Sequence, residues 1–151
     1  MSNSKINLKI ITPEKLILEE IVDQVSLPTT EGEITILPEH ISLITKLASG
    51  DIVAKTDGEE IPMAVVGGFL EVRSSSGGDV KTEVTVLADF AEHVSTISEE
   101  KIAEAKARAE ELRIQMENKE VVDYEHFAAE LERSLTRVKI ADKWRTRKYR
   151  K

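Results

Sequence analysis

The cations near the C-terminal end are the side chains of this sequence with the clearest chemical potential. Residues 133–151 hold 9 Lys or Arg and 1 Asp, whereas residues 1–96 hold 7 Lys or Arg against 16 Asp or Glu. Such a basic segment can bind an acidic surface or a phosphate group. Trp144 and Tyr149 alternate with its cations, a pattern that also suits stacking on single-stranded nucleic acid. The acidic remainder of the chain would repel a phosphate backbone, so a solvated tail and a docking arm for an acidic protein stay the main alternatives.

The sequence lacks the common patterns for metal binding and catalysis. His40, His93 and His126 stand apart from one another, without the spacing of metal ligands. There is no phosphate-binding loop, no dinucleotide-binding glycine motif and no nucleophile elbow. We therefore expect a protein that is not an enzyme and that has no metal site and no cofactor.

Length and composition fit one small domain with an appendage. The chain has 151 residues, 40% of them hydrophobic, and no cysteine, which excludes disulfides and thiolate metal sites. We see no signal peptide, and the longest apolar stretches are far shorter than the ~20 residues of a membrane span. The expectation is a soluble chain that meets a membrane only through a partner.

The elements that position these side chains change character near residue 95. Before it, apolar residues alternate, as in residues 6–10 and 80–86, with Gly, Pro and Asp-Gly turns between the runs. Asp57-Gly58 predicts a type I′ hairpin, and Gly67-Gly68 predicts a bulge or a close backbone approach. We predict that residues 1–95 form an antiparallel β-sandwich or flattened barrel of about eight to ten strands.

After the change, residues 96–142 predict an antiparallel helical hairpin, followed by a basic tail at residues 143–151. Thr96 and Glu99 suggest a capping box for the first helix, residues 118–120 a reversal, and Asp123 a cap for the second helix. The expected apolar stripes are Ile102, Ala105, Ala109, Leu112 and Met116, then Tyr124, Ala128, Leu131, Leu135 and Val138. Since so few of these side chains are large, we expect the hairpin to dock marginally and to be able to move.

Three segments together resemble the epsilon subunits of bacterial F-type ATP synthases, and the resemblance covers essentially the whole chain. They are residues 31–40 (EGEITILPEH), 66–72 (VGGFLEV) and 84–89 (VTVLAD). The family usually has Gly at the positions of Thr35 and Glu39, which predicts a local difference there. The stretch at residues 74–79 is also longer than usual in the family.

The resemblance implies a non-catalytic rotor subunit in the central stalk of a proton- or sodium-translocating ATP synthase. It implies that the sandwich binds the gamma subunit and sits on the c-ring, on the cytoplasmic side of the bacterial plasma membrane. A loop at the c-ring side is implied at Glu31, Gly32, Pro38 and His40.

The resemblance also implies that the hairpin is regulatory. Folded down, it permits rotation; extended, it enters the alpha/beta catalytic head and restrains ATP hydrolysis. The implied inhibitory contact consists of cations that would face an acidic segment of the beta subunit: Arg133, Arg137, Lys139 and Lys143.

Some family members bind ATP on the folded hairpin through a motif resembling I/L-D-x-x-R-A. Here Ser98 and Lys101 replace its Asp and Arg, and Ile102 replaces its Ala. Arg108, Arg133 and Arg137 are candidates for the later arginines, although each can equally be a solvated helix charge. We expect weak ATP binding or none. The alternatives are a stand-alone nucleotide-sensing regulator and a nucleic-acid-binding adaptor that uses the basic tail.

Overall fold

Two five-stranded sheets and two helices make up the part of the chain that the structure, a computed structural model, describes: residues 4–118, 123–147, 149 and 150. One sheet has the order β2-β1-β9-β8-β5 and the other β10-β7-β6-β3-β4. The strands are β1 (Lys5–Ile11), β2 (Leu16–Val22), β3 (Gln24–Thr29), β4 (Gly32–Ile36), β5 (Leu43–Lys46), β6 (Gly50–Thr56), β7 (Glu59–Val66), β8 (Phe69–Gly77), β9 (Val80–Leu87) and β10 (Phe90–His93). The predicted sandwich of about eight to ten strands is therefore confirmed.

The core lies between the two sheets because alternate residues of the strands face inward. In β1, Ile6, Leu8 and Ile10 are fully buried, and the residues between them are only partly buried. The inward residues of both sheets form one cluster, to which Val84 and Val86 of β9 belong. Each buried aliphatic side chain contributes about 1.5–3 kcal/mol relative to an exposed one, so the sandwich has its own source of stability.

The backbone confirms one predicted turn and one predicted close approach of two chain segments. Asp57 and Gly58 join β6 to β7 with φ values of 51° and 80°, as a type I′ turn requires. At Gly68 a Cβ atom would lie 2.0 Å from the carbonyl oxygen of Leu87, so the chains approach too closely for any side chain. Glu39 also has a positive φ, 69°, in the position where the resemblance predicts Gly.

The first helix begins at Glu99 and the second begins directly after Asp123. A 3₁₀ turn, η1 (Val94–Thr96), precedes α1 (Glu99–Glu117) and α2 (Tyr124–Trp144). The predicted capping box of Thr96 and Glu99 is wrong, because Ser98 caps α1 by accepting from the amide of Lys101 at 3.2 Å, while the Thr96 hydroxyl donates to the carbonyl of His93. Asp123 caps α2 as predicted, accepting from the amide of His126. The predicted reversal lies mostly outside the described residues, and Asn118 is the C-cap of α1.

The predicted apolar stripe of α1 agrees with the structure better than that of α2. Four residues of the α1 stripe are buried as predicted: Ile102, Ala105, Ala109 and Leu112. On α2 the prediction is wrong at Leu135, which is 53% exposed. Among the side chains of this helix that the structure describes, the buried ones are Ser134, Thr136, Ile140, Ala141 and Trp144. Helix α2 therefore turns a different face inward near its C-terminal end, and it continues past residue 142 to Trp144.

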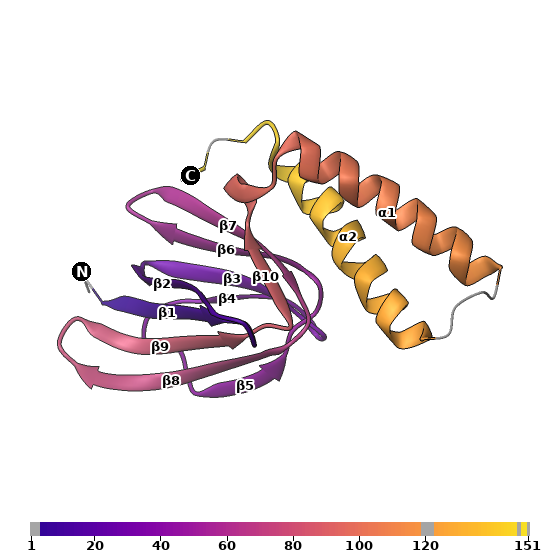
Figure 1. The fold of residues 1–151 in the computed structure, drawn as a ribbon. Coiled ribbons are helices and arrows are strands. Elements are labelled where there is room, and N and C mark those ends of the chain that lie inside the picture. The colour runs from indigo at the N-terminus through magenta and orange to yellow at the C-terminus, as the bar shows by residue number, and fades with distance from the viewer. Residues whose placement is uncertain (1–3, 119–122, 148, 151) are drawn as a thin grey trace.

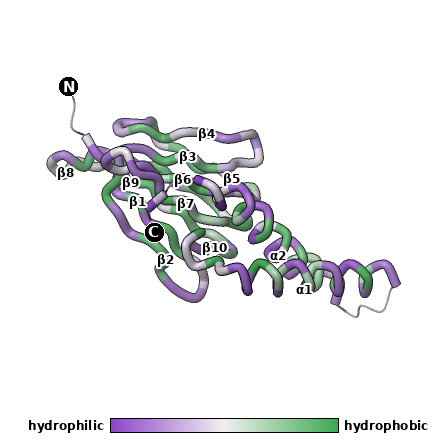
Figure 2. Tube along the Cα trace, turned by 90° about the horizontal axis from the view of Figure 1, so that it is seen from above, coloured by the Kyte–Doolittle hydropathy of each residue, from purple (hydrophilic) through white to green (hydrophobic). Residues whose placement is uncertain are grey.

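The hairpin contacts the sandwich through the start of α1 and through the part of α2 that runs from Glu132, which accepts from the Ser49 hydroxyl at 2.5 Å, to Trp144. Figures 1 and 2 show that the start of α1 and the end of α2 lie beside the sheet of β6, β7 and β10, whereas the opposite end of the hairpin projects away. Helix α2 contacts β7 and β6, and it packs along α1. Within the described residues, neither helix has the length and apolar character needed to cross a membrane.

Candidate functional site

A second, smaller apolar cluster joins the hairpin to the outer face of the β6–β7 sheet. It is separate from the sandwich core, and its largest member, Trp144, is only 1% exposed. The buried members are Ala64, Val94, Ile97, Ile102, Ile140, Ala141 and Trp144. Three of them are small, two alanines and a valine, and the other four are isoleucines and the tryptophan, so this cluster supplies the apolar contact at the sandwich end of the hairpin. Marginal docking of the hairpin stays a prediction.

Asp51 anchors the end of α2 to the sandwich. Its Oδ2 atom accepts from Nε1 of Trp144 and from Nζ of Lys143, each at 2.9 Å. Asp51 is only 8% exposed, and it pairs across the sheet with Ala64, which belongs to the same cluster as the indole. Hydrogen bonds to an ionised carboxylate in such a protected place are among the stronger polar contacts in proteins.

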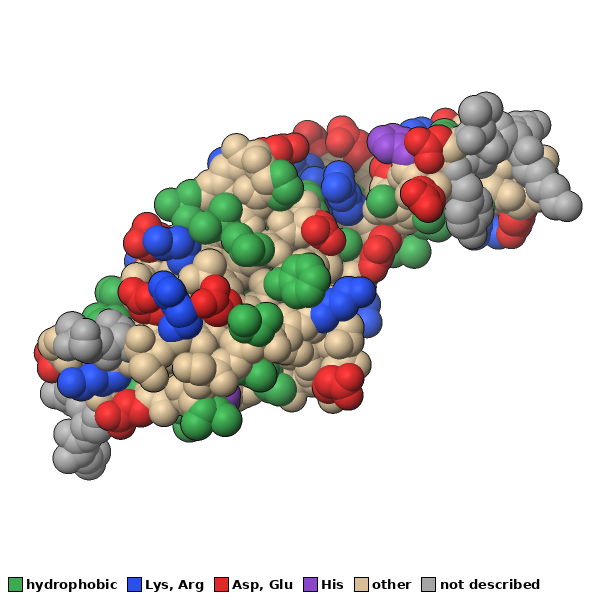
Figure 3. Space-filling model, turned by 90° about the horizontal axis from the view of Figure 1, so that it is seen from below, with side chains coloured by type: hydrophobic (Ala, Val, Ile, Leu, Met, Phe, Trp, Pro, Cys, Tyr) green, Lys and Arg blue, Asp and Glu red, His purple; other side chains and the backbone are tan. Residues whose placement is uncertain are grey.

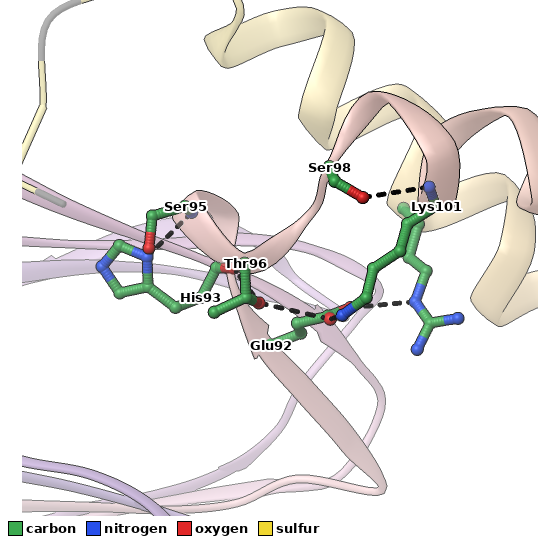
Figure 4. Close-up of polar contacts among 7 residues, drawn as sticks. Glu92, His93, Ser95, Thr96, Ser98 and Lys101 are labelled. Carbon is green, nitrogen blue, oxygen red and sulfur yellow. Dashed lines mark hydrogen bonds and ion pairs between the residues drawn. The ribbon is translucent and has the colours of Figure 1, made fainter.

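Glu92 ties both helices to β10. Its carboxylate accepts from Nζ of Lys101 on α1 and from Nε of Arg137 on α2, both at 2.9 Å (Figure 4). Burial by itself raises the pKa of Glu92, but the hydrogen bond from Lys101 and the charge of Arg137 outweigh it, and the net pKa is lowered. The side chain is 13% exposed, so one carboxylate neutralises two cations at the base of the hairpin.

The four cations of the predicted inhibitory contact are not in one place. Arg137 and Lys143 are paired with Glu92 and Asp51, and the Arg133 guanidinium lies 5.7 Å from the centre of the Phe90 ring. Lys139 is exposed and lines an apolar groove with residues such as Leu131 and Leu135. In the folded arrangement the sandwich therefore occupies three of these cations and leaves Lys139 at the surface.

The three candidate nucleotide-binding arginines do line one groove, between the hairpin and β10. Arg108, Arg133 and Arg137 share it with Lys101 and with three carboxylates, Glu104, Glu111 and Glu130. Glu130 binds Arg108 at 2.6 and 3.1 Å, and Glu111 binds it at 3.0 Å. These bonds raise the pKa of Arg108, and a phosphate group would have to displace them.

The C-terminal tail folds back onto the sandwich. The Tyr149 ring meets the Trp144 ring edge to face at 5.9 Å and lies 6.4 Å from the His93 ring. The amide of Arg150 donates to the carbonyl of Glu60, and its guanidinium pairs with Glu20 at 2.9 Å. Burial and the charge of Arg150 lower the pKa of His93. Because Trp144 is buried here, its indole has no free face for a nucleic-acid base.

The residues predicted for the c-ring side lie at the two ends of β4. Glu31 lies in the turn after β3 and Gly32 begins β4, whereas Pro38 and His40 follow this strand, which spans ~16 Å. Nδ1 of His40 lies 2.7 Å from the carbonyl oxygen of Ile41, whose side chain is 78% exposed. The four residues therefore occupy two turns and not a single loop.

An apolar row crosses the outer face of the other sheet. Ile11 pairs with Leu16 and with Leu87, and Leu87 pairs with Phe69, so the row runs over β2, β1, β9 and β8. Leu16, Leu87 and Phe69 are each more than half exposed. Figure 3 shows several hydrophobic side chains on this face, with charged side chains among them. An exposed row of this kind is typical of a surface that a partner protein covers.

Comparison with known proteins decides the family. Residues 5–94 match the family model for the β-sandwich domain of the ATP synthase delta/epsilon chain. The ATP synthase epsilon chain of Nitratidesulfovibrio vulgaris (strain DP4) is 39% identical over 135 residues, which are 89% of this chain and 94% of that one. The epsilon chain of Dehalococcoides mccartyi (strain CBDB1) is 40% identical over 144 residues, 94% and 96% of the two chains. The chain belongs to the ATP synthase epsilon family.

Solved structures show that this epsilon-family chain shares its fold with proteins of low identity. A chain of the Euglena gracilis mitochondrial ATP synthase is 24% identical, with a TM-score of 0.60 over 92% of this chain and 78% of that one. A chain of the Tetrahymena thermophila mitochondrial ATP synthase central stalk and c-ring is 15% identical, with a TM-score of 0.50 over 97% and 100%.

Sequence reasoning missed three residues of this epsilon-family hairpin contact: Asp51, Phe90 and Glu92. Each lies in or beside an expected strand, where a single carboxylate or ring is indistinguishable from an ordinary surface residue. One signal was present for Trp144, which follows Ile140 by four residues and so shares its helix face. The interleaved cations around Trp144 drew the interpretation toward an external ligand.

Proposed function

We propose that this chain is a non-catalytic subunit of the central stalk, one that links the catalytic head to the c-ring and restrains ATP hydrolysis through its C-terminal hairpin. Membership of the epsilon family supports the place in the enzyme. The observation that supports regulation is the pairing of Arg137 and Lys143 with carboxylates of the sandwich. Cations held by ion pairs and a small apolar cluster can exchange one acidic partner for another at modest cost.

The gamma subunit is the proposed partner of the apolar row on β2, β1, β9 and β8. Leu16, Leu87 and Phe69 offer exposed apolar area on a sheet that the hairpin leaves uncovered. The turns with Glu31 and Gly32, and with Pro38 and His40, are the proposed contacts with the c-ring. Since β4 separates these turns by ~16 Å, the ring would have to meet the sandwich over a broad surface.

In the extended state, the proposed inhibitory contact places Arg133, Arg137, Lys139 and Lys143 against an acidic surface of the alpha/beta head. Leaving the sandwich frees the first two from Phe90 and Glu92 and frees Lys143 from Asp51. The chain would then be a peripheral component on the cytoplasmic side of a bacterial plasma membrane, attached through gamma and the c-ring.

Gamma binding can be tested on the apolar row itself. Replacing Phe69 and Leu87 by Asp adds charge to the proposed interface without touching the core, so copurification with gamma should fall by at least about tenfold. Ile114→Asp is the control, because this residue is 45% exposed and lies on the hairpin. If the double variant folds and binds gamma like the parent protein, gamma does not use this face.

The stand-alone nucleotide sensor is the second candidate function, favoured by the grouping of Arg108, Arg133 and Arg137 in one groove. The carboxylates that already bind these arginines weigh against it. A nucleotide would gain phosphate contacts only after replacing Glu130 and Glu92 as their partners.

A further inference from the structure

The C-terminal end of the chain does more than terminate α2. We propose that Lys143, Trp144, Tyr149 and Arg150 form a clasp that holds the hairpin in its folded position, with Asp51 as its buried catch. This C-terminal clasp deepens the proposed function, on which its effect on ATP hydrolysis depends, whereas its existence can be tested on the isolated chain.

The catch is a single carboxylate oxygen with two donors from adjacent residues. Trp144 Nε1 and Lys143 Nζ both bind Oδ2 of Asp51 at 2.9 Å, so the end of α2 is fixed in position and in rotation about its axis. Trp144 and Ala64 belong to one apolar cluster, and Ala64 is the cross-strand neighbour of Asp51, so a small side chain stands beside the carboxylate. The contact thus combines a shaped apolar seat with a charge-assisted hydrogen bond.

Tyr149 and Arg150 complete the clasp on the outer side of the Trp144 indole. The Tyr149 ring packs on the Trp144 ring at 5.9 Å, and Arg147 lies 5.2 Å from the centre of the same indole. Arg150 then reaches Glu20 on β2 and the carbonyl of Glu60 on β7. The tail therefore covers the indole and fastens to two further strands, and α2 cannot lift its end without breaking these contacts as well.

The clasp can open without leaving a charge in an apolar interior. Asp51 lies on the outward side of β6, since its neighbour Ile52 points into the core, and Trp144 and Lys143 bind it from the hairpin side. When the hairpin lifts, water can replace both donors, so the cost of an unpaired buried carboxylate is avoided. Lys143 also belongs to the proposed inhibitory contact, so the clasp and the catalytic head compete for one cation.

Trp144 makes the clasp directly observable, because it is the only tryptophan of the chain. In the isolated full-length protein we expect an emission maximum typical of a buried indole. Asp51→Asn, and separately Tyr149→Ala with Arg150→Ala, should shift the emission to longer wavelength. The same variants should speed hydrogen exchange of the amides of residues 138–144 by about tenfold or more, as the loss of hydrogen bonds to a charged group predicts.

Two variants serve as controls for charge and for the helices. Asp79→Asn removes a carboxylate from the exposed turn between β8 and β9, and Lys106→Ala removes an exposed cation of α1. Neither should move the emission or the exchange rates. If the Asp51→Asn protein no longer unfolds cooperatively, the Tyr149→Ala, Arg150→Ala variant tests the clasp instead, because it alters only the tail. Parental emission and exchange in a folded Asp51→Asn protein and in the double variant would overturn the clasp.

ATP hydrolysis by the assembled enzyme tests the proposed regulation separately from the clasp. The Tyr149→Ala, Arg150→Ala variant should lower ATP hydrolysis severalfold, because a looser hairpin populates the extended state more often. Loosened exchange with unchanged hydrolysis would leave the clasp established and contradict inhibition by the hairpin. Unchanged exchange together with unchanged emission would contradict the clasp itself, whatever the hydrolysis rate.

Discussion

Nε of Arg137 lies 2.9 Å from the carboxylate of Glu92, and these residues are 45 positions apart in the sequence. The pair joins the last strand of the sandwich to the middle of α2, on the side of the hairpin that also carries the ring contact of Arg137 with Phe90. Lys101 binds the other oxygen of the same carboxylate. One side chain of β10 thus binds both helices, while Asp51 binds the C-terminal end of α2.

Acid should loosen the hairpin through Glu92. The pKa of this carboxyl is lowered in the folded arrangement, so its contribution to docking is complete above its unfolded pKa and is lost as pH falls through the lowered value. Hydrogen exchange of α2 amides, measured across this acidic range, should accelerate before the sandwich unfolds. Glu92→Gln should show roughly tenfold faster exchange at neutral pH and a smaller response to acid. An unaltered acid response in this variant would assign the effect to another group.

The sandwich should fold without the hairpin. Its core cluster lies between the two sheets, and removing the helices leaves this core in place while it uncovers the second cluster, with Ala64 and Val94 on the sandwich side. We expect residues 1–95 to unfold cooperatively with a β-type circular dichroism signal and to bind gamma with affinity within tenfold of the full chain. An unfolded fragment, or a larger loss of gamma affinity, would contradict this division of labour.

Alanine at Arg133, Arg137, Lys139 and Lys143 should raise ATP hydrolysis by the assembled enzyme several-fold and leave assembly intact. Several charge pairs at a partly desolvated interface can bias a two-state hairpin by a few kcal/mol, and raised salt should partly mimic the substitution. The hydrolysis rate of the quadruple variant, with and without added salt, is the measurement. A parental rate without salt dependence would refute inhibition through charge.

A substitution of Lys139 tests the extended state alone. The other three cations also contact the sandwich, so changing them alters the folded state as well. This lysine is exposed in the folded arrangement, so Lys139→Glu should weaken inhibition without changing Trp144 fluorescence. Lys106→Glu is the matched control on the exposed surface of α1. Equal hydrolysis rates for the two variants would remove Lys139 from the inhibitory contact.

ATP should bind the isolated chain more weakly than about 10 micromolar, because carboxylates hold the arginines of the groove. Glu130→Gln frees Arg108 from its bidentate partner and should strengthen binding by roughly tenfold, as measured by calorimetry. Glu110→Gln is the control, since Glu110 pairs with Arg113 within α1. Tight binding by the parent chain would show that the arginines accept phosphate despite their partners.

Local patterns in the sequence predicted local structure well. Asp57-Gly58 specified its hairpin because positive φ values restrict the residue types, and the period of α1 placed Ile102 and Leu112 on the buried face. The α2 stripe failed at Leu135 because helix α2 packs against two surfaces, α1 and the sandwich, and a single period cannot say which face meets which. Periodicity therefore predicted the type of fold, but it did not predict which face of α2 packs against the sandwich.

The contacts of the candidate site could not be predicted from the sequence for a related reason. Asp51 and Trp144 are 93 positions apart, and no local rule links a carboxylate on a strand to an indole at a helix end. The basic segment was correctly expected to seek an acidic surface, but that surface includes the chain's own Glu20, Asp51 and Glu92. The composition of the basic segment predicts that its cations pair with carboxylates, and only the three-dimensional arrangement shows which carboxylates these are.

The parallel pairing of β1 with β9 sets the order in which the molecule can be completed during synthesis. The sheet cannot close around β1 until Val80–Leu87 has left the ribosome, so the chain must hold that strand's edge open while the intervening hairpins form. Strand β10 follows at once and finishes the outer surface with β6 and β7. The helices therefore emerge after the sandwich surface that they pack against is complete, and Tyr149 and Arg150, which are made after the helices, fasten the hairpin to that surface.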